Sequence, residues 1–349
     1  MKCIICEKNS KKRDRDLNGN KCRFCGHPFV TEPSIDRLTD MAIRRTEDIV
    51  SSNGTFFFLE EHLKYHLMRR AKNSFVAKAF GWTGCLIGAM NNCLFNTVSI
   101  AITAVLLNHL KIIDVTIFLF IIFVFLLLRK IMPLRKIISR VKSKKTIRNV
   151  DKIVQKWIEI NPNPKLLTKD WGLRRLGDKN ANREDLEEVS FDRVLICDCN
   201  EYVDFFLANL FHFHYSCPVL GGNNYPEAVC ADMLCRLKKN PNLDIFLLHD
   251  FTPAGYAFVD QIRTDPNWFG DRNSASIIDL GLIEDQKYLF ESLSFEQTNR
   301  TTRTKTGKKI AELTIFKPDV LISMCGMAIN ERVPLHETSK KTDYFVGYG

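Results

Sequence analysis

The sequence predicts a multidomain membrane protein: a zinc ribbon, a two-helix transmembrane hairpin and a C-terminal α/β domain with a Rossmann-like parallel sheet. Two CxxC pairs near Met1, a strongly apolar central block, and alternating strand and helix patterns in the second half predict this order. The 349 residues are enough for about two domains. The expected parts are the ribbon at 1–30, amphipathic linker helices at 31–78, the hairpin at 80–128, basic juxtamembrane helices at 129–165 and the α/β domain at 190–335.

The composition indicates a basic protein with reduced cysteines. A formal net charge of +10 and a pI near 9.0 favour polyanionic partners, either nucleic acid or an anionic lipid surface. Four of the 12 cysteines form the CxxC pairs and the others are scattered, which fits one metal site better than a disulfide framework. We expect no cleavable signal, because Met1 leads directly into Cys3 and a Lys-rich stretch.

The two CxxC pairs predict a structural zinc ribbon. Cys3 and Cys6 form the first pair, Cys22 and Cys25 form the second, and tetrahedral Zn²⁺ takes four such thiolates. So small a fold has little core, so the metal would supply most of its stability. The basic residues between the pairs are expected to form the tip of a hairpin, which either contacts nucleic acid or is solvated. These tip residues are Lys11, Lys12, Arg13 and Arg15.

Two helices are expected between the ribbon and the apolar block. Ser34 would cap the first, which ends at Asn53 and Gly54. The second is amphipathic and runs over 57–72. His62 and His66 lie four residues apart on it, a spacing able to hold a metal, but neither a cysteine nor an acidic triad accompanies them. We therefore expect two solvent-exposed histidines.

The apolar block predicts two membrane-spanning helices, at about 82–107 and 112–128. A spanning helix needs about 20 apolar residues, and Asp114 is the only charge within these two runs. Lys and Arg are numerous on both outer flanks and scarce in the short loop, so the positive-inside rule places both termini in the cytoplasm. The expected localisation is an integral membrane protein that contacts the lipid bilayer and can oligomerise through the hairpin.

The second half of the chain alternates between strand and helix patterns. Strands are expected at 193–197, 217–220, 243–248 and 276–280, with a fifth at 319–324, and helices at 149–160, 201–213, 226–239 and 253–263. This alternation predicts a parallel sheet covered on both faces, which binds ligands beyond the carboxyl ends of its strands. Asp198 and Asp250 follow the first and third of these strands.

Residues 193–282 resemble a Toprim domain, the metal-binding Rossmann-like module of topoisomerases and primases. The form in the topoisomerase VI A subunit is the most similar. The segment from Asp250 to Gly255 parallels that family's Asp-x-Asp-Pro-x-Gly strand end, and 277–282 resembles the strand that follows. The resemblance implies that Asp198 and Asp250 hold a Mg²⁺ ion, with Glu201 one helical turn further on.

The sequence departs from the Toprim pattern in its acidic residues. The family's first glutamate is replaced by Asp198, and the second aspartate of its pair by Thr252. Two-metal phosphodiester chemistry needs more carboxylates than remain. The resemblance therefore implies a degenerate domain, with weak or absent Mg²⁺-dependent phosphodiester hydrolysis or transfer. The alternative is an unrelated α/β domain in which Asp198 and Asp250 only cap helices.

Further residues suit phosphate binding, and three functions stay open. Gly255 permits close backbone approach to a phosphate, and a basic loop carries Arg300, Arg303 and Lys305. The first function is a membrane-anchored protein whose cytosolic Toprim-like domain binds nucleic acid or nucleotide. The second is a membrane-tethered scaffold for a protein partner. The third is a pore-type effector, in which the cytosolic domain gates the hairpin.

Overall fold

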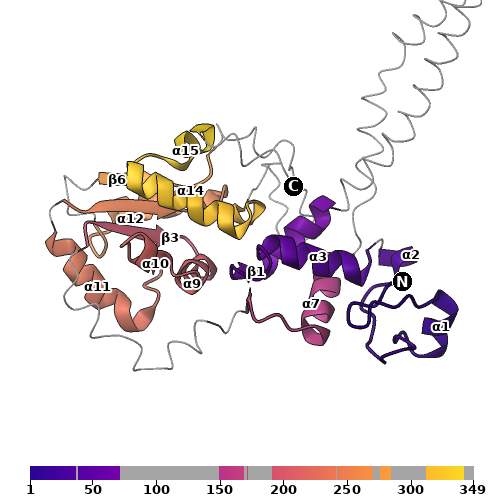
Figure 1. Ribbon diagram of the computed structural model, residues 1–349. Helices are drawn as coiled ribbons and strands as arrows, with labels where there is room; N and C mark the ends of the chain where they lie inside the picture. Colours follow the sequence, from indigo (N-terminus) through magenta and orange to yellow (C-terminus); the bar gives the residue numbers. More distant parts are fainter. Residues whose placement is uncertain are drawn as a thin grey trace, which may run out of the picture. The chain divides into compact units, whose positions relative to one another are not determined.

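The computed structural model describes residues 1–36, 38–70, 149–168, 171, 191–240, 242–269, 276–283 and 312–341. Contacts divide the chain into two compact units. The first contains Met1–Leu67 and Val150–Gly349, and it holds almost all the residues that the structure describes. Figure 1 shows its helices and strands in colour along the sequence.

The N-terminal segment consists of two turns with a short helix between them. Isolated antiparallel bridges close the turns, Lys2 with Asn9 and Lys21 with Pro28, and α1 (Lys12–Leu17) lies between them. The expected hairpin tip is therefore a helix. Arg15 on it is buried, and its Nη1 lies 2.9 Å from Glu32 Oε2. This ion pair withdraws Arg15 from the solvent-facing basic tip that the sequence predicted.

Two helices follow the ribbon where one was expected. They are α2 (Pro33–Asp36) and α3 (Asp40–Val50), and Thr39 caps the second, since its Oγ1 accepts a hydrogen bond from Ala42 N at 3.2 Å. The buried Asp40 carboxylate accepts hydrogen bonds from Val30 N (3.0 Å), Thr31 N (2.9 Å) and Thr31 Oγ1 (2.7 Å). These bonds fix the end of the ribbon to the first turn of α3.

The prediction that His62 and His66 are exposed is wrong. Both are buried on the helical stretch 60–70. The His62 ring lies 5.3 Å from the Phe205 ring, its Nδ1 accepts from Leu59 N at 3.2 Å, and burial lowers its pKa to about 3. The sequence pattern missed this packing because Phe205 lies far along the chain. The neutral histidine is a core residue.

A small parallel pair and a helix complete this part of the structure. β1 (Phe58–Leu59) pairs with β2 (Leu166–Leu167), and α7 (Val150–Ile160) precedes β2. The helix has the bounds expected from its apolar spacing, within one residue. Trp157 is fully buried on it.

Four parallel strands form the main sheet, as the sequence predicted. They are β3 (Arg193–Cys197), β4 (Val219–Gly221), β5 (Asp244–Leu248) and β6 (Ser276–Asp279), in the order β4-β3-β5-β6. In the register of β3 and β5, Cys197 lies opposite Leu248. The residues that follow these two strands therefore meet at one edge of the sheet.

Helices cover both faces of this sheet (Figure 1). Leu195 of β3 and Phe246 of β5 pack into a core that includes α9 (Asn200–Ala208) and α14 (Pro318–Glu331). The alternate residues of the same strands, Ile196 and Leu247 among them, pack into a second core with α11 (Glu227–Lys239) and α12 (Pro253–Thr264). This is the period of two expected of strands buried on both sides. The remaining elements are α10 (Phe211–His214), η2 (Leu313–Ile315) and α15 (Leu335–Lys341).

Two predicted elements differ from the structure. The fifth strand, expected at 319–324, lies inside α14, because a short buried apolar run does not distinguish a strand from a helix. The helix expected at 201–213 breaks at Leu210, whose φ is 57°. Beside the break, Asn209 Oδ1 accepts from Phe57 N at 2.9 Å, so its side chain contacts the backbone beside β1.

The predicted transmembrane hairpin is not supported by the structure. No helix among the described residues is long and apolar enough to cross a bilayer. The 14 residues of α14 extend about 21 Å at about 1.5 Å per residue, which is short of the roughly 30 Å of hydrocarbon. The predicted spans at 82–107 and 112–128 lie outside the described residues, as does most of the basic stretch after them. The predicted localisation as an integral membrane protein and the three membrane-bound functions depended on those spans. They are therefore not supported either.

Replacing Asp40 with alanine should destabilise the N-terminal segment. The substitution leaves three buried donors, on Val30 and Thr31, without their acceptor, so we expect a loss of about 2–4 kcal/mol in unfolding free energy. Denaturant unfolding together with hydrogen exchange at the Val30 and Thr31 amides would measure it. Asp48→Ala on the exposed side of the same helix is the control, and an equal effect there would contradict the role of Asp40.

Candidate metal centres

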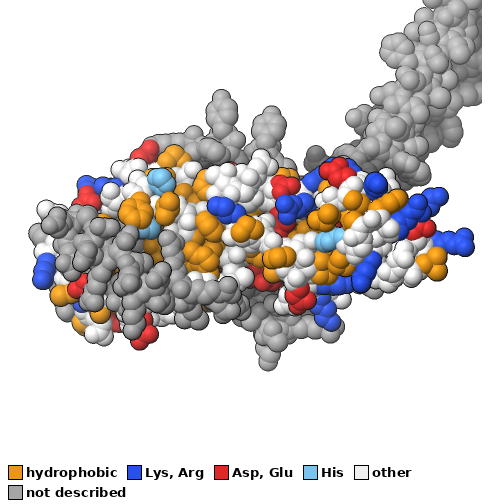
Figure 2. All heavy atoms as spheres, turned by 60° about the horizontal axis from the view of Figure 1, so that its bottom comes forward, with side chains coloured by type: hydrophobic (Ala, Val, Ile, Leu, Met, Phe, Trp, Pro, Cys, Tyr) orange, Lys and Arg blue, Asp and Glu red, His pale blue; other side chains and the backbone are white. Residues whose placement is uncertain are grey.

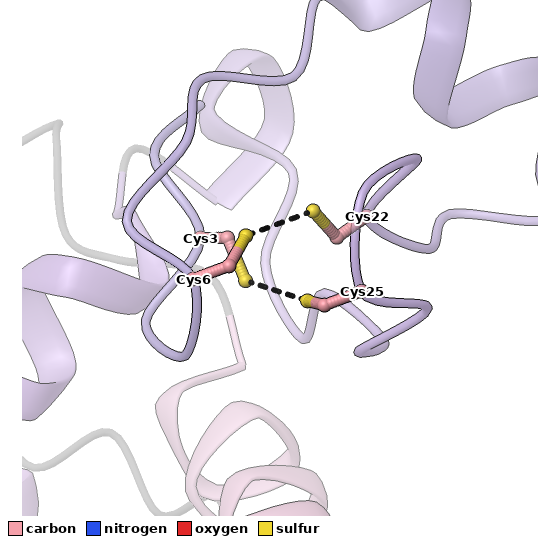
Figure 3. Close-up of side chains that lie close together, drawn as sticks. All are labelled: Cys3, Cys6, Cys22 and Cys25. Carbon is pink, nitrogen blue, oxygen red and sulfur yellow. Dashed lines mark hydrogen bonds between the residues drawn. The ribbon is translucent and has the colours of Figure 1, made fainter.

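The four N-terminal cysteines form one cluster, as predicted. Their Sγ atoms all lie within 4.8 Å of one another, and Figure 3 shows them converging from the two turns. Cys3 Sγ lies 3.6 Å from Cys25 Sγ, and Cys6 Sγ lies 3.6 Å from Cys22 Sγ. Four thiolates around a tetrahedral zinc at about 2.3 Å lie about 3.8 Å apart, whereas a disulfide bond is about 2.0 Å long. The spacing is that of a metal centre.

The backbone and a hydroxyl group favour thiolate at Cys22. Gly26 follows the second pair with a φ of 73°, and its N–H donates to Cys22 O at 2.8 Å. The pKa of Cys22 is lowered to about 6, because its burial is outweighed by backbone N–H donors from Phe24 and Cys25 and by the Ser10 hydroxyl. Burial raises the pKa of Cys3 to about 12. A bound cation would favour the thiolate form of Cys3, whose pKa burial raises.

A second group of polar side chains lies at the carboxyl ends of β3 and β5. Asp250 N donates to Asp198 Oδ2 at 3.1 Å, so the two predicted acidic residues meet. Asp250 Oδ1 accepts from Tyr202 Oη at 2.7 Å and from Leu313 N at 2.7 Å. Asp198 Oδ1 is buried without a hydrogen-bond partner among the described residues, although the Cys199 thiol lies close enough to the carboxylate to lower its pKa. The pair is thus held firmly, with one carboxylate oxygen unsatisfied.

Both carboxyl groups hold their protons more tightly than usual. Burial, together with the charge of Asp198, raises the pKa of Asp250 to about 7. Burial also raises the pKa of Asp198, and the hydrogen bond from Asp250 N and the nearby His249 offset this only in part. Two desolvated carboxylates at one edge disfavour each other's ionisation. A cation beside them would reverse that preference.

The fully buried His249 and the partly exposed Asp279 form a pair beside this edge. His249 Nδ1 lies 2.8 Å from the Asp250 carbonyl oxygen, and His249 Nε2 lies 3.1 Å from Asp279 Oδ1. The carbonyl oxygen can only accept, so Nδ1 donates to it, whereas Nε2 lies near Asp279 without a hydrogen bond of good geometry. Burial alone would lower the pKa of His249, but Asp279 and the Asp250 carbonyl outweigh it and the pKa is raised. The pKa of Asp279 is lowered, since His249 outweighs its burial.

No family model, curated protein or solved structure matches this chain. The cysteine cluster and the parallel sheet are compatible with a zinc ribbon and an α/β fold, and no family match confirms the Toprim resemblance.

The other predicted site residues lie in different surroundings. Glu201 is exposed in the first turn of α9. It does not form a metal-ligating group with Asp198 and Asp250, because the cysteine cluster is the only group of three or more such side chains within 4.8 Å among the described residues. Thr252 caps α12, with its Oγ1 accepting from Gly255 N at 2.9 Å. A Cβ at Gly255 would overlap the Asp250 carbonyl oxygen, so this glycine serves packing. Arg300, Arg303 and Lys305 lie outside the described residues.

The sequence interpretation missed three members of this edge, namely Tyr202, His249 and Asp279. Asp279 ends β6, the strand beside β5, so the strand-end argument that found Asp250 also applies to it. Gly281 carries a weaker signal, since a Cβ there would overlap the His249 ring. Tyr202 carries no sequence signal of its own, because an inward aromatic residue of a helix is usually part of the core.

Replacing Cys22 with serine should remove bound zinc. The exposed Cys235 on α11 provides a matched control, because Cys235→Ser changes a thiol that lies outside the cluster. We expect a single zinc ion per chain in the wild type and in Cys235→Ser by elemental analysis, and a strong loss in Cys22→Ser. Full zinc content in Cys22→Ser would rule out the four-sulfur site.

Replacing Asp250 with asparagine should stabilise the fold in Mg²⁺-free buffer as the pH rises. The unfolded carboxyl has a pKa of 3.8 and the folded one a pKa of about 7, so the wild type loses stability relative to the variant between these values. The amide oxygen of the new side chain still accepts from both hydrogen-bond donors. The unfolding free energy of Asp250→Asn minus that of the wild type should rise by up to about 4 kcal/mol between about pH 4 and pH 7.5. Asp232→Asn, at an exposed position of α11, should show no such trend, and a flat Asp250→Asn profile would contradict the raised pKa.

Proposed function

We propose that this protein binds two different metal ions. The four-cysteine ribbon holds a structural zinc ion, and the α/β unit is a degenerate Toprim-like domain that binds a single Mg²⁺ ion with Asp198 and Asp250. The observation that carries the second site is the buried, unsatisfied Oδ1 of Asp198 beside a carboxyl group whose pKa is raised to about 7. A divalent cation would supply the missing partner and remove the repulsion within the pair.

The donor atoms support a different metal at each centre. Four thiolates in tetrahedral spacing favour zinc over Mg²⁺, which prefers oxygen ligands. The pair of Asp198 and Asp250 supplies only carboxylate oxygens, and the Tyr202 hydroxyl and Leu313 N–H fix the orientation of Asp250. Both hydrogen bonds go to Oδ1 of Asp250. Its Oδ2 therefore supports cation binding without loss of either hydrogen bond.

The small number of carboxylates favours phosphate binding over hydrolysis. Mg²⁺ bound by one or two carboxylates keeps several waters, which phosphate oxygens of a ligand can replace. Glu201, which is exposed in the first turn of α9, would contact such waters in this proposal. Hydrolysis with two metals needs a richer acidic cluster. We therefore propose Mg²⁺-dependent binding of a phosphate-bearing ligand, such as a nucleotide, at the edge of the sheet.

Manganese provides a direct probe of the proposed site. In zinc-loaded full-length protein, electron paramagnetic resonance should detect a single tightly bound Mn²⁺ that Mg²⁺ displaces. Asp198→Asn should weaken this binding at least about tenfold, because it removes a charged ligand (about 1.4 kcal/mol per factor of ten). Asp260→Asn, which changes an exposed carboxylate on α12, should leave the affinity unchanged.

The variants must also be folded, which their zinc content and circular dichroism would establish. Wild-type protein that binds no Mn²⁺ saturably, or folded Asp198→Asn that binds it as tightly as the wild type, would overturn the proposed Mg²⁺ site. Neither result would affect the zinc centre, because its ligands lie on a separate segment.

A further inference from the structure

Each of the two cysteine turns exposes one large apolar side chain outside the metal cluster. Ile5 and Phe24 each occupy the third position of their CxxC turn, and they are 64% and 45% exposed. The chain leaves these large side chains in water, although Phe29 of the same segment is buried beside the cysteines. Single exposed apolar residues are common on protein surfaces, so the charged groups around Phe24 decide what this surface binds.

Two cations lie over the exposed aromatic ring. Lys8 Nζ is 5.0 Å from the centroid of the Phe24 ring, and Arg23 Cζ is 4.6 Å from it. Arg23 also pairs with Asp14 at 3.0 Å, whereas Lys8 has no ion pair among the described residues. The cationic groups of Lys8 and Arg23 are thus held next to an apolar surface.

The charge of the whole ribbon has the same sign. Residues 1–30 contain eight Lys and Arg against three Asp and Glu, a formal balance of +5 with His and Cys neutral. Even with four thiolates and one Zn²⁺, which together add −2, the balance is +3. Figure 2 shows Lys and Arg side chains beside exposed apolar ones toward its right-hand end, the side on which Figure 1 draws α1. This surface favours a partner that is negatively charged.

We propose that Ile5, Lys8, Arg23 and Phe24 form a binding site for single-stranded nucleic acid, separate from the Mg²⁺ site. A base would stack against Phe24 and Ile5, while Lys8 and Arg23 contact the neighbouring phosphates. Single strands combine flat apolar faces with regularly spaced negative charge, which matches an aromatic ring flanked by cations. An acidic peptide offers the charge without a row of flat faces. The occupant that fits both properties is therefore the nucleic acid.

The metal centre would make this surface rigid. Cys22 and Cys25 flank Arg23 and Phe24, and the bridge from Lys21 to Pro28 closes the same turn. A bound zinc fixes both turns relative to each other. The side chains then lose little freedom on binding, which favours affinity.

Fluorescence anisotropy with a labelled oligothymidine would test the site, using zinc-loaded full-length protein in Mg²⁺-free buffer. Phe24→Ala should weaken binding by roughly 5- to 100-fold, because stacking on one aromatic residue is lost. Lys8→Ala should weaken it and reduce the slope of log affinity against log salt by about 0.7, the loss of one phosphate contact. Leu17→Ala, at a 77% exposed apolar residue of α1, and Lys11→Ala are the matched controls, with affinities close to the wild type.

All variants should retain their zinc, since none changes a ligand. Wild-type protein that does not bind the oligonucleotide would overturn the proposal. So would equal losses in Phe24→Ala and Leu17→Ala, or equal losses in Lys8→Ala and Lys11→Ala, because binding would then follow general charge and apolarity. The absence of Mg²⁺ from this experiment keeps its outcome independent of the proposed function of the α/β unit.

Discussion

The parallel pairing of β3 with β5 is the constraint on which the acidic edge depends. Because Cys197 lies opposite Leu248, the chain leaves both strands at the same edge, and Asp250 N reaches the Asp198 carboxylate. The sheet is buried on both faces, so this register is strongly specified by its apolar side chains. The packing of the sheet therefore holds the two carboxylates together, although their partial burial disfavours their charged forms.

The residues around the pair offset part of that unfavourable charge. His249 lies behind the edge with its Nε2 3.1 Å from Asp279 Oδ1, and Gly255 and Gly281 leave the space that its ring and the Asp250 carbonyl occupy. The backbone N–H of Leu313 reaches the same edge from a segment far along the chain. Several elements therefore converge on Asp250. Asp198 Oδ1, which is buried without a hydrogen-bond partner among the described residues, is the atom that the proposed cation would contact.

Local patterns in the sequence predicted much of the fold and only part of the site. The bounds of β3 and the four-cysteine cluster follow from a buried apolar run and from CxxC spacing, which depend on neighbouring residues alone. The burial of His62 and the helical state of 319–324 depend on partners distant in the chain, and the sequence interpretation was wrong at both. Apolar runs in the central block predicted membrane helices by length and hydropathy, and no described helix meets those criteria. Tyr202 and His249 escaped notice because their roles arise only when three strands are assembled.

Anomalous diffraction at the manganese edge, from crystals of the zinc-loaded protein soaked in Mn²⁺, tests the central claim most directly. The account predicts a peak about 2.0–2.3 Å from Asp198 Oδ1 and beside Asp250, with water completing the coordination shell. A well-ordered edge without a peak, or manganese bound only at exposed carboxylates elsewhere, would contradict it.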